Sequence, residues 1–464
     1  MSAAVPRRDP IVALDTALIV VGLAVLFVLP TTSSPPSWRP GSLLWHDGWV
    51  RYRVVEAVAQ HLPLDEVGSV VPRWSARWPL IGTLTALPLW YAGSLVESPA
   101  WWLARYNALL FALAVGALWL LLKDKIDRGL LRTLLLVLVA ASMFPGHVVA
   151  FFGSEVFTAV LVGVGLIALV TGRPRLGWGA VILGVANTPA SLVGLALVVL
   201  VWTWRTRQLR YLLVPAAALV LVLGDAWIRS RQFLPSYLGT DRGPRNPLPY
   251  SGLAGFSYPF FFGVLSILFS FGKGLVFFTP GMFLPVRRLL LAVKEELWAG
   301  HVSHLAFVTG LVVAYAPWRG WDGGFFWGPR FFLIASFPAS VALAVRLHRA
   351  GGSVLGRLVT VGVLTLSTWV AVSGAAFGMA DLTRCDSSTG ATDDYLCAYT
   401  LEFSALWHPF VQPQPLSGRD VAFVAVAAAV LVRLAGPVLY GIAQDLGRMR
   451  SERRSAPRAR VWRL

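Results

Sequence analysis

Long apolar runs recur along the whole 464-residue chain and constrain its fold more than any other feature. Runs of about 17–25 apolar residues have the length that an α-helix needs to cross the ~30 Å hydrocarbon core of a bilayer. The composition agrees, because 56% of the residues are hydrophobic and only 14% are charged. The sequence therefore predicts an all-α polytopic membrane protein, a single bundle of about 12 transmembrane helices with no separate soluble domain.

The apolar runs and the polar residues between them place the predicted spans. These lie near residues 11–30, 101–122, 133–150, 156–171, 177–188, 190–204, 211–228, 275–292, 301–316, 331–345, 358–378 and 421–442. The first run, IVALDTALIVVGLAVLFVLP, is longer than the apolar core of a signal peptide, and no small-residue cleavage site follows it. We therefore expect it to be a retained span.

The net charge of +17 is explained by membrane topology better than by nucleic-acid binding. If the N-terminus starts inside, the short loops KDKIDR, GRPR, WRTRQLR, PVRRLL and RLHRAGG fall on the same side as the basic tail 443–464. Lys and Arg accumulate in this way on the cytoplasmic side of membrane proteins. The pattern predicts cytoplasmic N and C termini, contact with membrane lipids, and no nucleic-acid partner. The usage of Ala, Arg, Val and Gly is typical of a high-GC bacterium, so we expect a bacterial cytoplasmic membrane.

The segment 31–100 is predicted to be the first outer loop, with two juxtamembrane helices. Residues 46–61 have the pattern of an amphipathic helix. On this helix Asp47 and Arg51 lie one turn apart, just after the chain leaves the first span, and Asp47 near the helix start complements the helix dipole. One interpretation is a structural ion pair that stabilises the helix, and the other is a pair of functional side chains.

The second juxtamembrane helix is predicted within PRWSARWPLIGTLTALPLWYAG. This stretch places Arg73 and Arg77 among tryptophans. Its prolines interrupt what would otherwise resemble a span. A span here would also move the basic loop KDKIDR to the outer side, against the charge rule.

Two charged residues stand at the outer ends of predicted spans. Glu155 occurs in FPGHVVAFFGSEVFTAV, and a carboxylate facing lipid would be costly, so it is expected to face a wet cavity. Lys273 stands between glycines in FSFGKGL, where the backbone can approach a ligand closely and the ammonium suits a phosphate. The alternatives are an ordinary interface residue for Glu155 and a snorkelling lysine for Lys273.

The stretch WRGWDGGFFWGPRFFLIA combines Trp321 and Trp327 with Asp322 and Arg330. Tryptophan is common in interfacial belts, which is the alternative interpretation. The three glycines in the same stretch indicate a constructed turn. Because Trp rings also stack against sugars, we expect this turn to face a substrate.

The two cysteines, Cys385 and Cys397, lie in one predicted outer loop, 379–420. An outer location permits a disulfide between them, and two unrelated thiols are the alternative. Two cysteines alone are a poor zinc site, since zinc usually takes four ligands. The sequence has no Walker A, Rossmann, HExxH or GxSxG pattern, which argues against nucleotide, metalloprotease and serine-hydrolase sites.

These stretches, in this order, resemble the GT-C superfamily of membrane glycosyltransferases, especially its protein-O-mannosyltransferase-like and aminoarabinose-transferase-like members. The resemblance rests on HDGWVRYRVVEA, SARWPLIG, FGSEVFTAV, FSFGKGLVFFTPGMF and WDGGFFWGPRFFLIASFP, and it extends to about residue 340. The family's usual Asp-Glu pair is Asp-Gly here, at Asp47 and Gly48. The missing second carboxylate weakens the case for a metal at this position.

The resemblance implies a GT-C-type bundle and an inverting transfer of a sugar from a polyprenyl-phosphate donor to a glycan, lipid or protein hydroxyl on the outer face. Asp47 would be the general base, and Asp322 is the second candidate. The implied phosphate-binding residues are Arg51, Arg73, Arg77, Lys273 and Arg330. The implied sugar- or acceptor-binding residues are Glu155, Asp322, Trp321, Trp327 and Tyr52. No cofactor is required, with a divalent metal ion as an alternative.

Two other classes of protein fit part of the pattern. A lipid-linked glycan ligase or polymerase of another polytopic class would also have arginine-rich outer loops. A lipid or sugar transporter would carry ionisable residues deep inside its spans. The candidates for such residues are Asp15, Asp225 and Arg433, and all three are expected near span ends.

Overall fold

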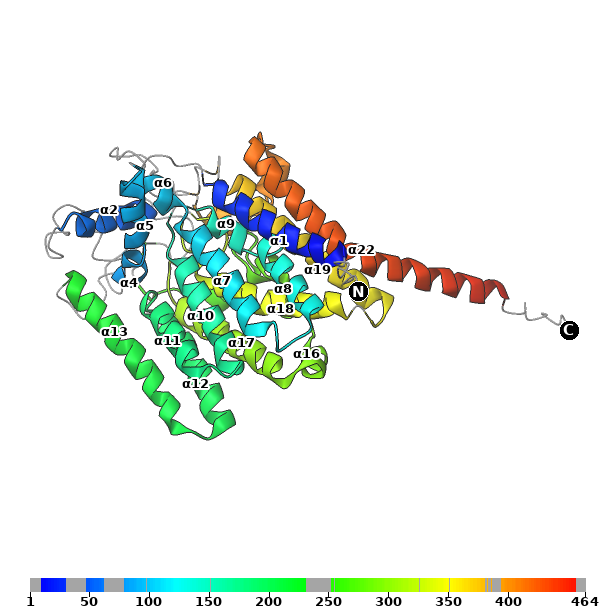
Figure 1. The fold of residues 1–464 in the computed structure, drawn as a ribbon, viewed down its shortest axis with the longest axis horizontal. Coiled ribbons are helices and arrows are strands. Elements are labelled where there is room, and N and C mark those ends of the chain that lie inside the picture. Colours follow the sequence, from blue (N-terminus) through cyan, green and yellow to red (C-terminus); the bar gives the residue numbers. More distant parts are fainter. Residues whose placement is uncertain are drawn as a thin grey trace, which may run out of the picture.

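The computed structural model is a bundle of helices (Figure 1). It describes residues 10–30, 47–61, 79–96, 98–150, 152–230, 252–253, 255–324, 326–349, 351–379, 382, 385 and 394–455. No strand occurs within these residues, so the predicted all-α class is confirmed.

In the described part of the chain, six helices are long and apolar enough to cross a membrane. They are α1 (Pro10–Val28), α13 (Leu213–Ser230), α17 (Glu295–Tyr315), α18 (Ser336–His348) together with the 3-10 helix η5 (Arg330–Ala335), α19 (Val354–Val372) and α22 (Gly418–Ser455). Shorter apolar helices are α7 (Tyr106–Leu122), α10 (Glu155–Val170), α11 (Pro174–Ala186), α12 (Ser191–Thr206) and α14 (Phe260–Phe269). The predicted polytopic membrane architecture is confirmed.

Several predicted spans are not single helices, 101–122 among them, which contains the end of α6 (Pro99–Ala104) as well as α7. The span 275–292 is divided into α15 (Leu275–Phe278), η4 (Pro280–Phe283) and α16 (Arg287–Val293). Pro280 and Pro285 cause this division, because proline removes a helical hydrogen bond and clashes with the preceding turn. The span 133–150 is divided into α8 (Arg128–Ala140) and α9 (Phe144–Val148). Two of the short elements, α9 and α15, lie beside the candidate site, where His147 and Phe278 pack against Trp327.

The first predicted outer segment contains several short helices. They are α2 (Asp47–Ala59), α4 (Leu80–Leu84), α5 (Leu87–Ser94) and α6 (Pro99–Ala104), and they gather at one end of the bundle, at the left in Figure 1. The predicted amphipathic helix at 46–61 thus corresponds to α2. Prolines lie at or just before the first turns of α4, α5 and α6, where the missing N–H is tolerated.

Close helix packing brings the starts of α10 and η5 together. A Cβ on Gly163 of α10 would lie 2.2 Å from the ring of Phe337 in α18, so only glycine permits this approach. On the other side of α10, a Cβ on Gly165 would lie 2.9 Å from the carbonyl oxygen of Gly177 in α11. Small residues allow such close approach of helices in membranes. The packing sets Glu155, at the start of α10, near Arg330, at the start of η5.

Candidate active site

Residues 318–324 and 326–330 belong to a glycine-rich turn at the end of the bundle. Gly323, Gly324 and Gly328 have φ values of +76°, +69° and +65°, in the left-handed region that favours glycine. This backbone aims three carbonyl groups at one point. The constructed turn that the glycines indicated is therefore present.

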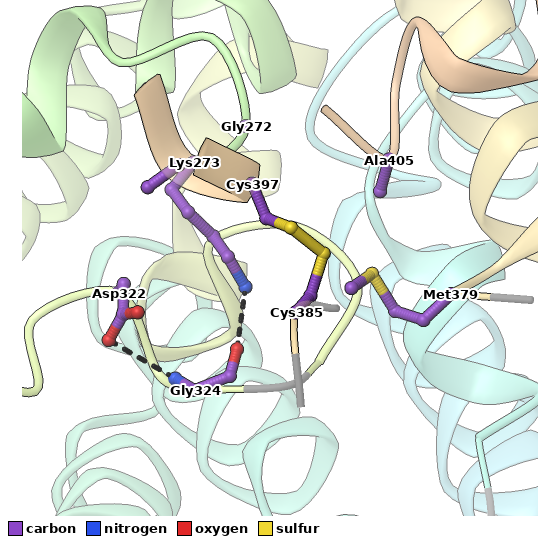
Figure 2. A pocket seen from close by; sticks show the side chains of 9 residues that line it. Gly272, Lys273, Asp322, Gly324, Met379, Cys385, Cys397 and Ala405 are labelled. Carbon is purple, nitrogen blue, oxygen red and sulfur yellow. Dashed lines mark hydrogen bonds between the residues drawn. A yellow bond between two sulfur atoms is a disulfide. The ribbon is translucent and has the colours of Figure 1, made fainter. Parts of the chain in front are cut away.

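Lys273 occupies that point. Its Nζ donates hydrogen bonds to the carbonyl oxygens of Gly324 at 3.0 Å, Gly328 at 3.2 Å, and Phe326. Figure 2 shows the bond to Gly324. A lysine ammonium has three N–H donors, and here all three are used. Lys273 therefore holds the turn in place.

The surroundings of Lys273 destabilise the protonated form of its side chain. The side chain is buried, and burial lowers the pKa of the ammonium to about 8, with the positive charge of Arg330 acting in the same direction. The carboxylate of Asp322 opposes this shift. Asp322 itself accepts a hydrogen bond from the backbone N–H of Gly324 at 3.2 Å, so it is part of the same turn.

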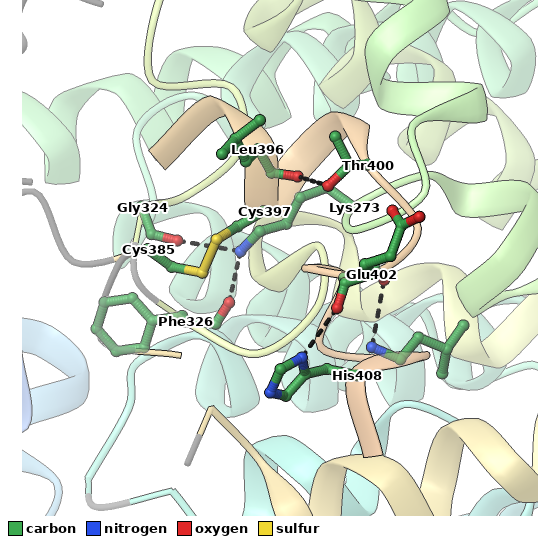
Figure 3. The surroundings of a disulfide bond; sticks show 11 residues. Lys273, Gly324, Phe326, Cys385, Leu396, Cys397, Thr400, Glu402 and His408 are labelled. Carbon is green, nitrogen blue, oxygen red and sulfur yellow. Dashed lines mark hydrogen bonds between the residues drawn. A yellow bond between two sulfur atoms is a disulfide. The ribbon is translucent and has the colours of Figure 1, made fainter. Parts of the chain in front are cut away.

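The segment that carries the cysteines covers Lys273. Cys385 and Cys397 form a disulfide with their Cα atoms 5.7 Å apart, and Figure 3 shows it beside the Lys273 ammonium. The backbone N–H of Gly272 donates to the carbonyl of Ala398 at 3.0 Å. A Cβ on Gly272 would lie 1.8 Å from the carbonyl oxygen of Cys397. The disulfide segment therefore packs directly against the turn before Lys273.

Arg330 makes the main ion pair of the site. Its Nη1 donates to Oε1 of Glu155 at 3.1 Å, and the two side chains are only 10% and 15% exposed. The guanidinium also lies over the ring of Phe326, 3.8 Å from its centroid. Gly323 permits this position, because a Cβ there would lie 2.9 Å from Cγ of Arg330. The turn and the start of α10 together hold a buried cation beside a carboxylate.

Two asparagines position the loop that carries Glu155. Asn107 of α7 donates to the carbonyls of His147 and Ala150 at 3.3 and 3.2 Å. Asn187, which follows α11, donates to the carbonyl of Ser154 at 3.2 Å. Neither asparagine was predicted from the sequence. The only sequence feature that could have indicated these positions is an isolated amide residue at the end of an apolar run.

Asn187 also connects this loop to the first outer segment. Its Oδ1 accepts a hydrogen bond from the backbone N–H of Gly82 in α4 at 3.2 Å, and its Nδ2 donates to Oγ1 of Thr158 at 2.9 Å. Both bonds are buried. One amide side chain therefore joins α4 to the start of α10.

Helix α2 approaches the same region through a small hydrophobic core. Tyr52 is buried in it together with Phe152 and Phe157, which flank Glu155 in the sequence. Arg51, on the neighbouring position of α2, is 3% exposed, and its charge acts on the hydroxyl of Tyr106. The structure thus gathers Arg51, Tyr52 and Glu155 at one end of the bundle.

The two predicted tryptophans are buried in the walls of the site. Trp327 packs edge-to-face against His147 and Phe278, and its Nε1 donates to Oγ of Ser373 at 3.3 Å. Trp321 packs against Tyr258 and Tyr399. Both indoles support the glycine-rich turn. Their predicted contact with a sugar stays a prediction.

Three predicted residues cannot be placed in the site. Arg73 and Arg77 lie outside the described residues. Asp47 is the first residue of α2, and its side chain is also outside the described part. Its backbone position, one turn before Arg51, agrees with the predicted spacing.

The bundle has a counterpart among solved structures. It is similar to the crystal structure of ArnT from Cupriavidus metallidurans bound to undecaprenyl phosphate, with a TM-score of 0.51, covering 92% of this chain and 78% of that chain. The chain has the ArnT fold. The GT-C-type fold predicted from the motifs is thereby confirmed. Sequence identity to ArnT is 15%, and no protein-family model and no curated protein matches the sequence.

Proposed function

We propose that this chain is an inverting glycosyltransferase that moves a sugar from a polyprenyl-phosphate donor to an acceptor hydroxyl on the outer face of a bacterial cytoplasmic membrane. The observation that carries the proposal is the buried Arg330–Glu155 pair at the end of an ArnT-fold bundle. ArnT itself was solved with undecaprenyl phosphate bound. A buried arginine with its planar donors suits the phosphate of such a lipid.

The proposed step replaces one carbon–oxygen bond at the anomeric carbon with another and transfers one proton. The carboxylate of Asp47 takes the proton of the acceptor hydroxyl while its oxygen attacks the anomeric carbon. The bond from that carbon to the phosphate oxygen breaks, and the polyprenyl phosphate leaves with the bonding electrons. Attack opposite to the leaving group inverts the configuration. Arg330 and Arg51 stabilise the charge that develops on the leaving phosphate, together with Arg73 and Arg77 from the first outer segment.

The proposed roles of the other residues follow from their contacts. Lys273 uses all its donors on the turn, so we assign it to positioning Arg330 and Asp322. Glu155 sets the orientation of the Arg330 guanidinium and, with Tyr52 and Asp322, borders the space for the sugar or acceptor. Trp321 and Trp327 shape that space from behind the turn.

The test uses purified full-length protein and a panel of polyprenyl-phosphate sugars, with binding and turnover measured separately. We expect wild type to consume at least one donor, and Asp47→Asn to bind the same donor without turning it over. Asp124→Asn, at an exposed position in the loop between α7 and α8, is the matched control and should retain turnover. If wild type binds no such donor, the proposed function is wrong. If Asp47→Asn retains turnover, the assignment of the base is wrong.

A further inference from the structure

A second polar cluster lies at the opposite end of the bundle from the candidate active site. It lines a cavity of about 170 Å³, with Asp15, Arg132, Thr133, His348 and Arg433 among its walls. Helix α18, Ser336–His348, lies between Arg330 and the His348 wall of this cavity, and its 13 residues span about 20 Å. We call this cavity the Arg132 pocket.

Helices α1, α8, α18 and α22 contribute the residues of the Arg132 pocket. In Figure 1, α1, α8 and α18 lie close together near the N-terminus, with α22 alongside. Asp15 is 3% exposed within α1, a helix that otherwise consists of apolar residues and Thr16. A lone carboxylate at such a position would be costly without cationic partners.

Two arginines share that carboxylate. Nε of Arg132 donates to Oδ2 of Asp15 at 3.3 Å, and Nη2 of Arg433 donates to the same oxygen at 3.2 Å. Nε of Arg433 also lies 2.8 Å from Oδ1. Two guanidinium groups against one carboxylate leave a surplus of positive charge in the pocket.

The two terminal Nη groups of Arg132, which we call its fork, make no hydrogen bond with the residues that the structure describes. The Arg132 side chain is 13% exposed. A planar pair of N–H donors fits two oxygens of a phosphate group. A cavity of this size has room for several water molecules, and hence for a phosphate.

The surface beside the pocket is apolar. Leu14 and Val432, next in sequence to Asp15 and Arg433, are 48% and 72% exposed. Ile11 on α1 is also exposed. In a membrane these side chains face acyl chains, so a lipid lying against α1 and α22 can place its headgroup at the pocket. Basic pockets between transmembrane helices bind anionic lipid headgroups in this way.

We propose that the Arg132 pocket binds the phosphate group of an anionic phospholipid, held by the fork of Arg132 and by Arg433. Asp15 is the internal counter-ion that keeps both guanidiniums aimed at one point. His348 also lines the pocket, and its Nε2 lies 3.3 Å from Oδ1 of Asp127. The site is independent of sugar transfer and concerns how the bundle is anchored in its membrane.

The experiment measures lipid binding by the full-length protein. Purified protein is titrated with phosphatidylglycerol or phosphatidylcholine, and retained lipids are counted by native mass spectrometry while the apparent Tm is followed. We expect phosphatidylglycerol to raise the Tm by about 3 °C more than phosphatidylcholine, and one tightly retained phosphatidylglycerol per chain. Arg132→Gln should lose both effects, and Arg433 still neutralises Asp15 in that variant.

The controls distinguish the effect of the positive charge at position 132, the effect of the guanidinium geometry and the source of the phosphate group. Arg288→Gln changes an exposed arginine on α16 and should behave as wild type. Arg132→Lys keeps the charge without the fork and should retain phosphatidylglycerol more weakly, which also gives a readout if Arg132→Gln fails to fold. Stabilisation by inorganic phosphate equal to that by lipid would support the phosphate site and identify a free anion as its ligand. Equal retention of phosphatidylglycerol by wild type and both Arg132 variants would overturn the proposal.

Discussion

The guanidinium of Arg330 donates to the carboxylate of Glu155 across 3.1 Å, although the two residues are 175 positions apart. Glu155 belongs to the first turn of α10, and Arg330 begins η5 after the glycine-rich turn. The ion pair therefore joins two elements that each contribute to the candidate active site. The pair is a structural connection, and in the proposed function Arg330 also supplies positive charge to the leaving phosphate.

Removing one partner of this pair should be costly. Glu155→Gln and Arg330→Gln are each expected to lower the free energy of unfolding by about 3 kcal/mol, because an unpaired charge stays buried. The double variant should lose less than the sum, with a coupling of about 1 kcal/mol or more in a double-mutant cycle. Denaturant unfolding in detergent measures all four proteins. The exposed pair Arg205–Glu295 provides the control cycle, with an expected coupling below about 1 kcal/mol.

Two glycines of the same turn make a matched pair of substitutions. Gly324 and Gly328 both have a positive φ, so alanine should cost about 1 kcal/mol at each. A Cβ on Gly328 would lie 3.0 Å from the ring of Phe278, whereas a Cβ on Gly324 meets nothing within 4 Å. Gly328→Ala should therefore weaken donor binding about tenfold or more by displacing the turn, and Gly324→Ala much less. Equal losses in donor titrations would contradict the role given to Phe278.

The disulfide should stabilise the segment over Lys273. Cys385 and Cys397 are 12 residues apart, and in the chain-entropy model closing a loop of this size contributes about 3 kcal/mol. Cys385→Ser with Cys397→Ser is expected to lose about that much stability. Because the disulfide segment contacts Gly272, the double substitution should also weaken donor binding at temperatures where the bundle stays folded. Chemical reduction of wild type should reproduce the double variant, and reduction of the double variant should change nothing.

The ammonium of Lys273 predicts an alkaline limit to activity. Its pKa of about 8 is below the ordinary 10.5, so between these values the unfolded chain retains a proton that the folded chain has released. By linkage, the contribution of Lys273 to the free energy of unfolding rises with pH in this window. The neutral amine has one N–H fewer, so one of three turn carbonyls loses its donor and sugar transfer should fall with an apparent pKa of about 8.

The measurement is a pH profile of turnover from pH 6.5 to 9.5, with unfolding followed in parallel. Lys273→Arg stays protonated throughout and should lack the alkaline limb, even if its turnover is lower overall. A loss of stability that follows the loss of activity would instead indicate general alkaline unfolding, and the assignment to Lys273 would be wrong.

Sequence patterns predicted the membrane architecture because its physical cause is local. A span requires only a run of apolar residues of sufficient length, and the runs that became α1, α17 and α19 meet that requirement. The glycine-rich turn was also predictable, since Gly323, Gly324 and Gly328 stand close together. The division of 275–292 was not predicted, because the run is apolar enough for a span although it contains Pro280 and Pro285.

The contacts that assemble the site were not predictable in the same way. Nothing near Asn187 in the sequence indicates that its amide reaches Ser154 on one side and Gly82 on the other. Lys273 looked like a phosphate ligand because glycines flank it, yet those glycines admit the disulfide segment and let the backbone turn. Such partners are distant in the chain, so their pairing depends on the packing of whole helices.

Helix α22 has a consequence for the electrostatics outside the bundle. With 38 residues it is about 57 Å long, nearly twice the hydrocarbon thickness, and Figure 1 shows it projecting beyond the other helices. Pro437 lies inside this helix, where a proline removes a helical hydrogen bond and bends the helix. The part of α22 that follows Pro437 therefore leaves the bundle in its own direction (Figure 1). Arg448 in this part is exposed, so its charge is available to anionic groups outside the bundle.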